Sequence, residues 1–194
     1  MKIFCVSLGR NGTQSLTQFL RDQGISTTHF YRFKDLEPGT FSEDADGIYE
    51  HFLSLPDTDA HVDIPTCLVF DRVFEKYPDA RYINITRPEQ EWVASMQKIS
   101  SLLAHDHDPY IFEEAYCNFY ANTGKTKIQD LTAEELKLIR TTHLNRIDSF
   151  FKDRDNYLEV ELSDPDIGNK IRKFINSDIE IEFPLIDRIY NLTI

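Results

Sequence analysis

Cysteine is scarce in this sequence, and the few cysteines are widely spaced. The chain has three, Cys5, Cys67 and Cys117, and none belongs to a Cys-x-x-Cys pattern. An odd number of distant cysteines argues against a disulfide framework and offers no zinc-binding pattern. A reducing compartment therefore fits the sequence best, and no metal site is expected.

Long apolar runs and positive charge are also in short supply. No run approaches the length of a membrane span, and the apolar residues after Lys2 are too few for a signal peptide. Lys and Arg number 21 against 33 Asp and Glu, which gives a formal net charge of -12. This charge opposes binding to nucleic acid, because phosphate backbones are held mainly by Lys and Arg. We expect a cytoplasmic protein with no membrane or nucleic-acid partner, in which a local basic pocket holds any anion.

Internal repeats, low-complexity tracts and long linkers are absent as well. The chain has 194 residues, of which 41% are hydrophobic and fourteen are Phe, so it is long enough to close one core. We expect a single domain that spans residues 1–194.

Predicted strands and helices alternate along the chain. A capping box, Thr132-x-x-Glu135, begins the longest of the later helices. Strands are expected at 3–8, 25–33, 61–64, 81–86 and 157–162, and helices from 13 and at 48–53, 68–76, 88–103, 132–150 and 167–175. This alternation predicts a three-layer α/β/α fold with a mostly parallel central sheet.

The first predicted strand ends in a turn with two glycines, and an amphipathic helix begins inside that turn. The turn reads Gly9-Arg10-Asn11-Gly12-Thr13-Gln14-Ser15. Free N–H groups and the positive end of the helix dipole make such a turn an anion site. A Walker loop would carry Lys directly after its second glycine, and here Thr13 follows Gly12, so hydrolysis of a magnesium nucleotide is disfavoured.

A second candidate anion site follows the strand predicted at 81–86. Arg87 stands at the end of this strand, and Ser95 comes eight residues later, about two helical turns on. In a parallel sheet, ligands gather at the carboxyl ends of the strands. Two separate phosphate sites at this edge would suit a nucleotide with two phosphorylated positions.

Both segments resemble motifs of the sulfotransferases. Ser7-Leu8-Gly9-Arg10-Asn11-Gly12-Thr13-Gln14-Ser15-Leu16 looks like the family's 5'-phosphosulfate loop. The segment from Ile83 through Thr86-Arg87-Pro88 to Ser95-Met96 resembles its 3'-phosphate segment, and Tyr77-Pro78-Asp79-Ala80 before the strand is also similar. The likeness is clear in the first half of the chain.

The resemblance implies a P-loop NTPase-like sulfotransferase fold and a specific reaction. A sulfuryl group would pass from 3'-phosphoadenosine 5'-phosphosulfate (PAPS) to a hydroxyl or amine of a small-molecule or glycan acceptor, without a metal. Arg10 would stabilise charge on the leaving oxygen. The implied ligands of the 5'-phosphosulfate are Arg10, Asn11, Gly12, Thr13, Gln14 and Ser15, and those of the 3'-phosphate are Arg87 and Ser95.

The acceptor must also lose a proton, and a base is expected near the transferred group. In cytosolic sulfotransferases a catalytic His lies in a Thr-His-Leu-Pro-like turn, and the similar turn here reads Val62-Asp63-Ile64-Pro65. Asp63 is the expected base. His61 would point to the same side if the segment is extended and would share the proton transfer, while His29 and His51 are alternatives.

Other interpretations remain open at this stage. One is a binding module that keeps the nucleotide site without chemistry, and another is a small-molecule kinase, which the missing loop Lys disfavours. The run His105-Asp106-His107-Asp108 resembles a metal site but is expected to be a solvated loop. The chain is shorter than most sulfotransferases, which leaves open an acceptor site completed by a second copy in a homodimer.

Overall fold

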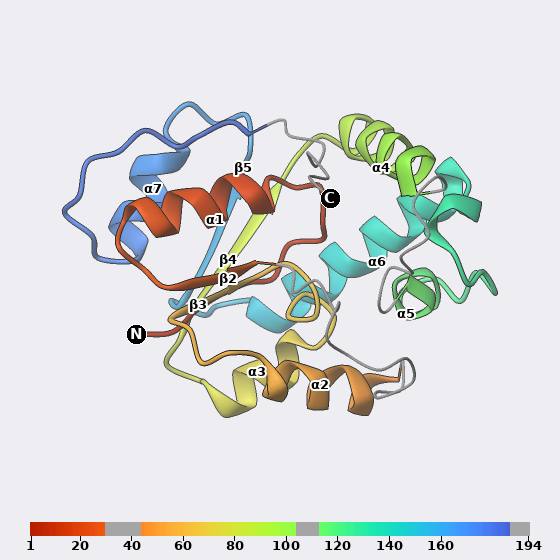
Figure 1. Ribbon diagram of the computed structural model, residues 1–194, viewed down its shortest axis with the longest axis horizontal. Helices are drawn as coiled ribbons and strands as arrows, with labels where there is room; N and C mark the ends of the chain where they lie inside the picture. The colour runs from red at the N-terminus through yellow and green to blue at the C-terminus, as the bar shows by residue number, and fades with distance from the viewer. Residues whose placement is uncertain (30–43, 104–112, 187–194) are drawn as a thin grey trace.

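The computed structural model describes residues 1–29, 44–103 and 113–186, which form a parallel sheet with helices on both faces (Figure 1). The strands are β1 (Ile3–Cys5), β2 (Thr27–His29), β3 (Ala60–Val62), β4 (Arg81–Thr86) and β5 (Tyr157–Glu161). The helices are α1 (Thr13–Asp22), α2 (Ala45–Ser54), α3 (Phe70–Lys76), α4 (Glu89–Leu103), α5 (Glu113–Asn118), the 3-10 turn η1 (Ile128–Asp130), α6 (Ala133–Phe151) and α7 (Ile167–Phe174).

The strand order is β2-β3-β1-β4-β5, and every neighbouring pair is parallel. The predicted α/β fold with a mostly parallel sheet is therefore confirmed. Central β1 pairs with β3 on one side and with β4 on the other, with Ile3 opposite both Ala60 and Arg81. The next strands in sequence, β2 and β3, lie on one side of β1, whereas β4 and β5 lie on the other. The loops after the neighbouring strands β1 and β4 therefore run in opposite directions along the sheet. The crevice between two such loops, at the carboxyl ends of the strands, is where α/β sheets bind ligands.

Alternate side chains of the central strands build two separate cores. Ile3 and Cys5 of β1 face one core together with Leu16 and Phe19 of α1, and Ile171 of α7 packs there too. Successive residues of a strand point to opposite faces of its sheet. The other face of β1 packs against α2 to α6, so Figure 1 has α1 and α7 on one side and α2, α3 and α6 on the other.

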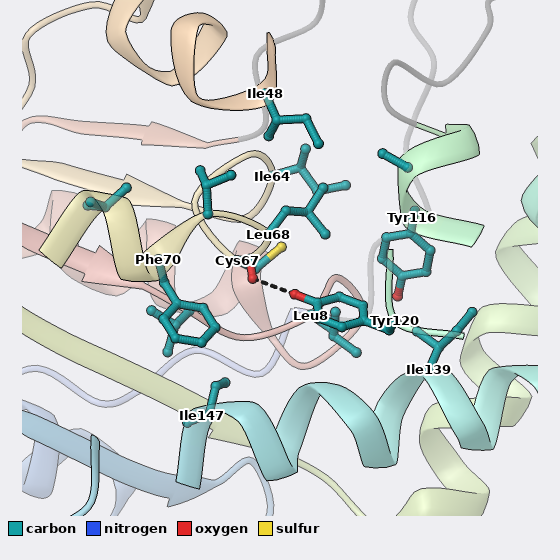
Figure 2. Close-up of a cluster of buried hydrophobic side chains, with 14 of the residues drawn as sticks. Leu8, Ile48, Ile64, Cys67, Leu68, Phe70, Tyr116, Tyr120, Ile139 and Ile147 are labelled. Atoms are coloured by element: carbon teal, nitrogen blue, oxygen red, sulfur yellow. Dashed lines mark hydrogen bonds between the residues drawn. The ribbon is translucent and has the colours of Figure 1, made fainter. Parts of the chain in front are cut away.

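The larger core lies on the side of α2 to α6 (Figure 2). This core contains a buried hydrogen bond, in which the Tyr120 hydroxyl donates to the Cys67 carbonyl oxygen at 2.8 Å. Tyr116 is 1% exposed in the same core. Both tyrosines are buried in this core. The bond from Tyr120 connects the segment after α5 to the segment after β3.

Most predicted elements are found with small shifts of their ends. The strand at 81–86 and the Thr132–Glu135 capping box agree with prediction. The first strand is shorter than the predicted 3–8, because Ser7 leaves the ladder and its hydroxyl accepts the Ile85 N–H at 2.6 Å. Residues 30–33 of the second predicted strand and the run 105–108 lie outside the described residues. Within the described residues, every helix is too short or too polar to cross a bilayer.

Candidate functional site

The glycine-punctuated turn adopts left-handed backbone at two positions. Arg10 has φ 69° and Gly12 has φ 83°. A side chain at Gly12 would be strained by this φ, and its Cβ would also lie 2.5 Å from Leu162 Cδ1. Gly12 is the residue directly before α1, and no side chain caps the helix there.

The N-terminus of α1 presents several backbone N–H groups. The first helical bond runs from Leu16 N to Gly12 O at 2.9 Å. The amides of Thr13, Gln14 and Ser15 come before this bond, so they have no acceptor within the helix. The positive end of the helix dipole lies at the same place. The turn therefore has the local geometry of an anion site.

The end of β4 lies against this turn. The Arg87 guanidinium donates from Nη1 to the Arg10 carbonyl oxygen at 3.2 Å, and Arg10 Nε donates to Ser95 Oγ at 3.0 Å. Trp92, which is fully buried in α4, donates its indole N–H to the Gly9 carbonyl oxygen at 2.9 Å. The two candidate phosphate segments, far apart in the sequence, are thus in direct contact.

A third segment reaches the turn from β3. Asp63 follows β3 with φ 77°, and its Oδ2 accepts a hydrogen bond from Thr13 Oγ1 at 2.8 Å. His29, the last residue of β2, lies beside both, with Nε2 3.6 Å from Asp63 Oδ2 and 3.3 Å from Thr13 Oγ1. The Ile64 N–H donates to Asp63 Oδ1 at 2.9 Å. The carboxyl ends of β1, β2 and β3 therefore converge on one carboxylate.

The surroundings of Asp63 favour its ionised form. Burial by itself raises the pKa of this carboxyl, but hydrogen bonding and charge from His29, the Thr13 hydroxyl and the Ile64 N–H together lower its pKa below the ordinary value. Asp63 is therefore a carboxylate at neutral pH.

His61 does not lie in this cluster. Its ring stacks on Phe4 with 5.7 Å between ring centroids, and its Nε2 is 3.5 Å from Thr58 Oγ1, which lies before β3. The expectation that His61 and Asp63 point to the same side is wrong, because the left-handed backbone at Asp63 interrupts the alternation of an extended strand. Burial lowers the pKa of His61 to about 4, and burial likewise lowers that of His51, in α2, to about 4.

The remaining predicted residues of the turn also have defined surroundings. Asn11 is buried, and its Oδ1 has no hydrogen-bond partner among the described residues. Ser15 is buried, and its Oγ accepts the Ile186 N–H at 2.9 Å, so its hydroxyl hydrogen can still be donated to a ligand. Gln14 is partly exposed. No cluster of His, Cys, Asp or Glu suited to a metal ion occurs in residues 1–29, 44–103 or 113–186.

Comparison with protein families assigns the chain to one of them. The Sulfotransferase domain matches residues 2–187. The chain belongs to the sulfotransferase family. A curated relative, Ava biosynthesis cluster protein M of Aspergillus versicolor, is 29% identical over an alignment of 112 residues, and the match covers 50% of this chain and 42% of that protein. The match thus spans less than half the length of that relative.

Two solved structures share the fold of this chain. A sulfotransferase from Alicyclobacillus acidocaldarius matches with a TM-score of 0.53 and 15% identity, over 98% of this chain and 86% of its own. Mouse sulfotransferase SULT7A1, complexed with PAP, matches with a TM-score of 0.51 and 15% identity, over 93% of this chain and 60% of its own. At this identity the comparison establishes a common α/β architecture.

The structure identifies two site residues, His29 and Arg140, more clearly than the sequence does. His29, one of several alternative bases in the sequence, is the histidine that contacts Asp63 and Thr13. The sequence does not predict Arg140 of α6 as a site residue, yet its Nη2 donates to the Arg87 carbonyl oxygen at 2.8 Å. No local motif marks Arg140, because its contact joins residues 53 positions apart.

Proposed function

We propose that residues 1–194 form one PAPS-dependent sulfotransferase domain, which transfers a sulfuryl group to a hydroxyl or amine of a small-molecule or glycan acceptor. The observation that carries this proposal is the hydrogen bond from Arg87 Nη1 to the Arg10 carbonyl oxygen, 3.2 Å long. It joins the two segments that the 5'- and 3'-phosphates require. The likeness in fold to the mouse sulfotransferase complexed with PAP supports the same donor.

The turn and α1 would hold the 5'-phosphosulfate. The amides of Thr13, Gln14 and Ser15 point toward the anion site, and Arg10 adds a guanidinium. During transfer the bond between sulfur and the 5'-phosphate oxygen breaks, and negative charge grows on that oxygen. Fixed N–H donors and a cation at this oxygen stabilise the transition state more than the ground state. Arg87 and Ser95 would hold the 3'-phosphate. This second contact would fix the position of the nucleotide relative to the turn that holds the 5'-phosphosulfate.

Asp63 and His29 would receive the acceptor proton. The acceptor oxygen or nitrogen forms the new bond to sulfur while its proton passes to the base, and the adenosine 3',5'-bisphosphate (PAP) leaves. Asp63 is nearly closed off from solvent, whereas the side chain of His29 is 14% exposed. We infer that His29 takes the proton and that the Asp63 carboxylate orients and stabilises the imidazolium, as in other carboxylate–histidine pairs.

The donor assignment is tested by calorimetry with PAP. We expect wild-type protein to bind PAP, and Arg87→Ala to weaken binding by about 1 to 3 kcal/mol, the range for loss of a charge-assisted hydrogen bond. Arg154→Ala is the matched control, because Arg154 donates to the Phe150 carbonyl oxygen and stacks on Phe74 instead. If the wild-type protein gives no heat with PAP, the donor assignment is wrong.

A transfer assay separates the enzyme from an inactive binding module. Labelled PAPS is incubated with a panel of phenols, alcohols and amines, and sulfated products are counted. Product formation that is lost in Asp63→Asn supports the enzyme. Tight PAP binding without any product would favour the binding module, and magnesium-dependent binding of ATP would favour a kinase.

A further inference from the structure

Three arginines from three different elements are linked at the carboxyl edge of the sheet. Arg140 Nη2 donates to the Arg87 carbonyl oxygen at 2.8 Å, Arg87 Nη1 donates to the Arg10 carbonyl oxygen at 3.2 Å, and Arg10 Nε donates to Ser95 Oγ at 3.0 Å. Each guanidinium is thus held by a neutral oxygen. The turn after β1, the end of β4 and the middle of α6 contribute one arginine each.

Among the described residues, ion pairs balance only part of these three positive charges. Within the described part of the chain, Glu91, 3.3 Å from Arg87 Nη2, is the one carboxylate in ion-pair contact with any of them. Counted from ion-pair contacts alone, the three guanidiniums and one carboxylate carry a formal charge of +2, in a chain whose net charge is -12. Like charges gathered in this way repel one another unless an anion binds between them.

Arg140 also lies where the dipole of α4 disfavours a positive charge. Arg87 precedes α4 by two residues, and the first bond of that helix runs from Trp92 N to Pro88 O at 3.0 Å. Arg140 therefore contacts the backbone at the positive end of the α4 dipole, where a cation is unfavourable. A neutral amide could make the same hydrogen bond to the Arg87 carbonyl oxygen. The charge of Arg140 has no structural use in this contact, but it suits an anion that lies beside Arg87.

The guanidinium of Arg140 has more N–H donors than its bond to Arg87 uses. It carries five N–H groups, and one of them makes the bond to Arg87. Arg140 is partly exposed, so a ligand can approach this side chain. The bond to Arg87 holds the planar group in place before any ligand arrives, which lowers the entropy lost on binding.

We propose that Arg140 is a third cation of the donor site and binds the 3'-phosphate of the nucleotide together with Arg87. This inference rests on the proposed function, since it takes PAP and PAPS as the ligands. Arg140 binds the nucleotide directly, in addition to positioning Arg87 through its backbone.

The test compares two nucleotides that differ in the 3'-phosphate. Dissociation constants for PAP and for adenosine 5'-monophosphate are measured by calorimetry with wild-type protein, Arg140→Gln and Arg140→Lys. We expect Arg140→Gln to weaken PAP about tenfold to a hundredfold, as for loss of a charge-assisted hydrogen bond, while the monophosphate is nearly unaffected. Arg140→Lys, which keeps the charge, should recover part of the PAP affinity and still favour PAP over the monophosphate.

The matched control is Arg146→Gln on the same helix. Arg146 Nη1 also donates to a backbone carbonyl oxygen, that of Leu68, at 2.8 Å, but its guanidinium pairs with Asp71. This variant loses the same charge and the same kind of bond, and its ratio of the two dissociation constants should equal that of the wild type.

Each remaining outcome overturns the inference in a recognisable way. Equal loss for both nucleotides in Arg140→Gln would mean that Arg140 supports the site as a whole and makes no particular contact with the 3'-phosphate. Unchanged PAP binding in that variant would remove Arg140 from the site while the donor assignment stands. A wild-type protein that binds no PAP would reject the donor assignment, and the role of Arg140 with it. If Arg140→Gln does not fold, the same ratio measured on Arg140→Lys decides, with an unchanged ratio counting against the proposal.

Discussion

Acid should destabilise this protein through its buried histidines, and His143 is the clearest case. His143 lies in α6 and is 1% exposed. Its Nε2 donates to the Val6 carbonyl oxygen at 2.8 Å, and its Nδ1 is 2.9 Å from the Tyr120 hydroxyl. A carbonyl can only accept, so Nε2 carries the proton of the neutral ring, and Nδ1 is an acceptor that shares the single hydroxyl hydrogen of Tyr120 with the Cys67 carbonyl oxygen. Burial lowers the pKa of His143 from 6.5 to about 3.

The magnitude follows from the two pKa values. Between pH 6.5 and about 3 the unfolded chain binds a proton at His143 that the folded protein does not bind, so stability falls as pH falls through this window. At pH 5, about 1.5 units below the unfolded pKa, the loss is about 2 kcal/mol at about 1.4 kcal/mol per unit. His51 and His61, each with a pKa of about 4, add similar losses. The sum of about 6 kcal/mol is comparable with the whole stability of many domains.

Denaturant unfolding at several pH values measures this loss, with the fluorescence of Trp92, the one tryptophan, as the signal. Between pH 6 and 5 we expect His143→Gln to reduce the dependence of unfolding free energy on pH by about one third, because one of three buried histidines is removed. The control is Thr132→Ala, which removes the capping box of the same helix. It should cost about 1 kcal/mol and change the slope between pH 6 and pH 5 much less than His143→Gln does, because the hydrogen bonds from Thr132 hold the pKa of Glu135 below its ordinary value. Equal stability of the wild type at pH 7.5 and pH 5 would refute the reasoning.

Further predictions concern the anion turn and the proton acceptor. Gly12→Ala should lose more stability than Gly24→Ala in thermal unfolding: both positions have positive φ, which costs about 1–3 kcal/mol, but the new Cβ meets Leu162 only at position 12. Equal losses would mean that Leu162 moves aside freely. Asp63→Asn and His29→Gln should each lower sulfuryl transfer by about 10²- to 10⁴-fold while PAP binding persists. The double variant should lose little more than either single one, because the two side chains act as a unit; additive losses would separate their roles.

Strong local patterns made much of the fold predictable. β4 is found at the predicted residues because a stretch rich in aromatic and β-branched residues is bounded by a Tyr-Pro-Asp turn and by Pro88. The capping box fixed the start of α6 for a similar reason. β1 was predicted too long, because Val6 and Leu8 are as buried as strand residues although the chain has already left the ladder. Burial alone does not distinguish a strand from a buried loop.

Fewer residues of the candidate site than elements of the fold could be predicted from the sequence. The turn around Gly12 and the pair Arg87 and Ser95 carry local signals, since a helix N-terminus and a strand end each impose residue types over a short stretch. The role of His61 could not be judged in this way, because one residue with left-handed backbone, Asp63, decides which way the segment faces.

The sequence by itself determined the order of the elements, the anion-binding turn and the second phosphate segment, because helix caps, glycine positions and apolar periodicity act over neighbouring residues. Only the tertiary structure decided that β2, β3, β1 and β4 end side by side, and hence that His29 contacts Asp63 and that Arg140 contacts Arg87. Such contacts depend on strand order and helix packing, which are set by the burial of whole faces and leave no mark on the residues next to them in the chain.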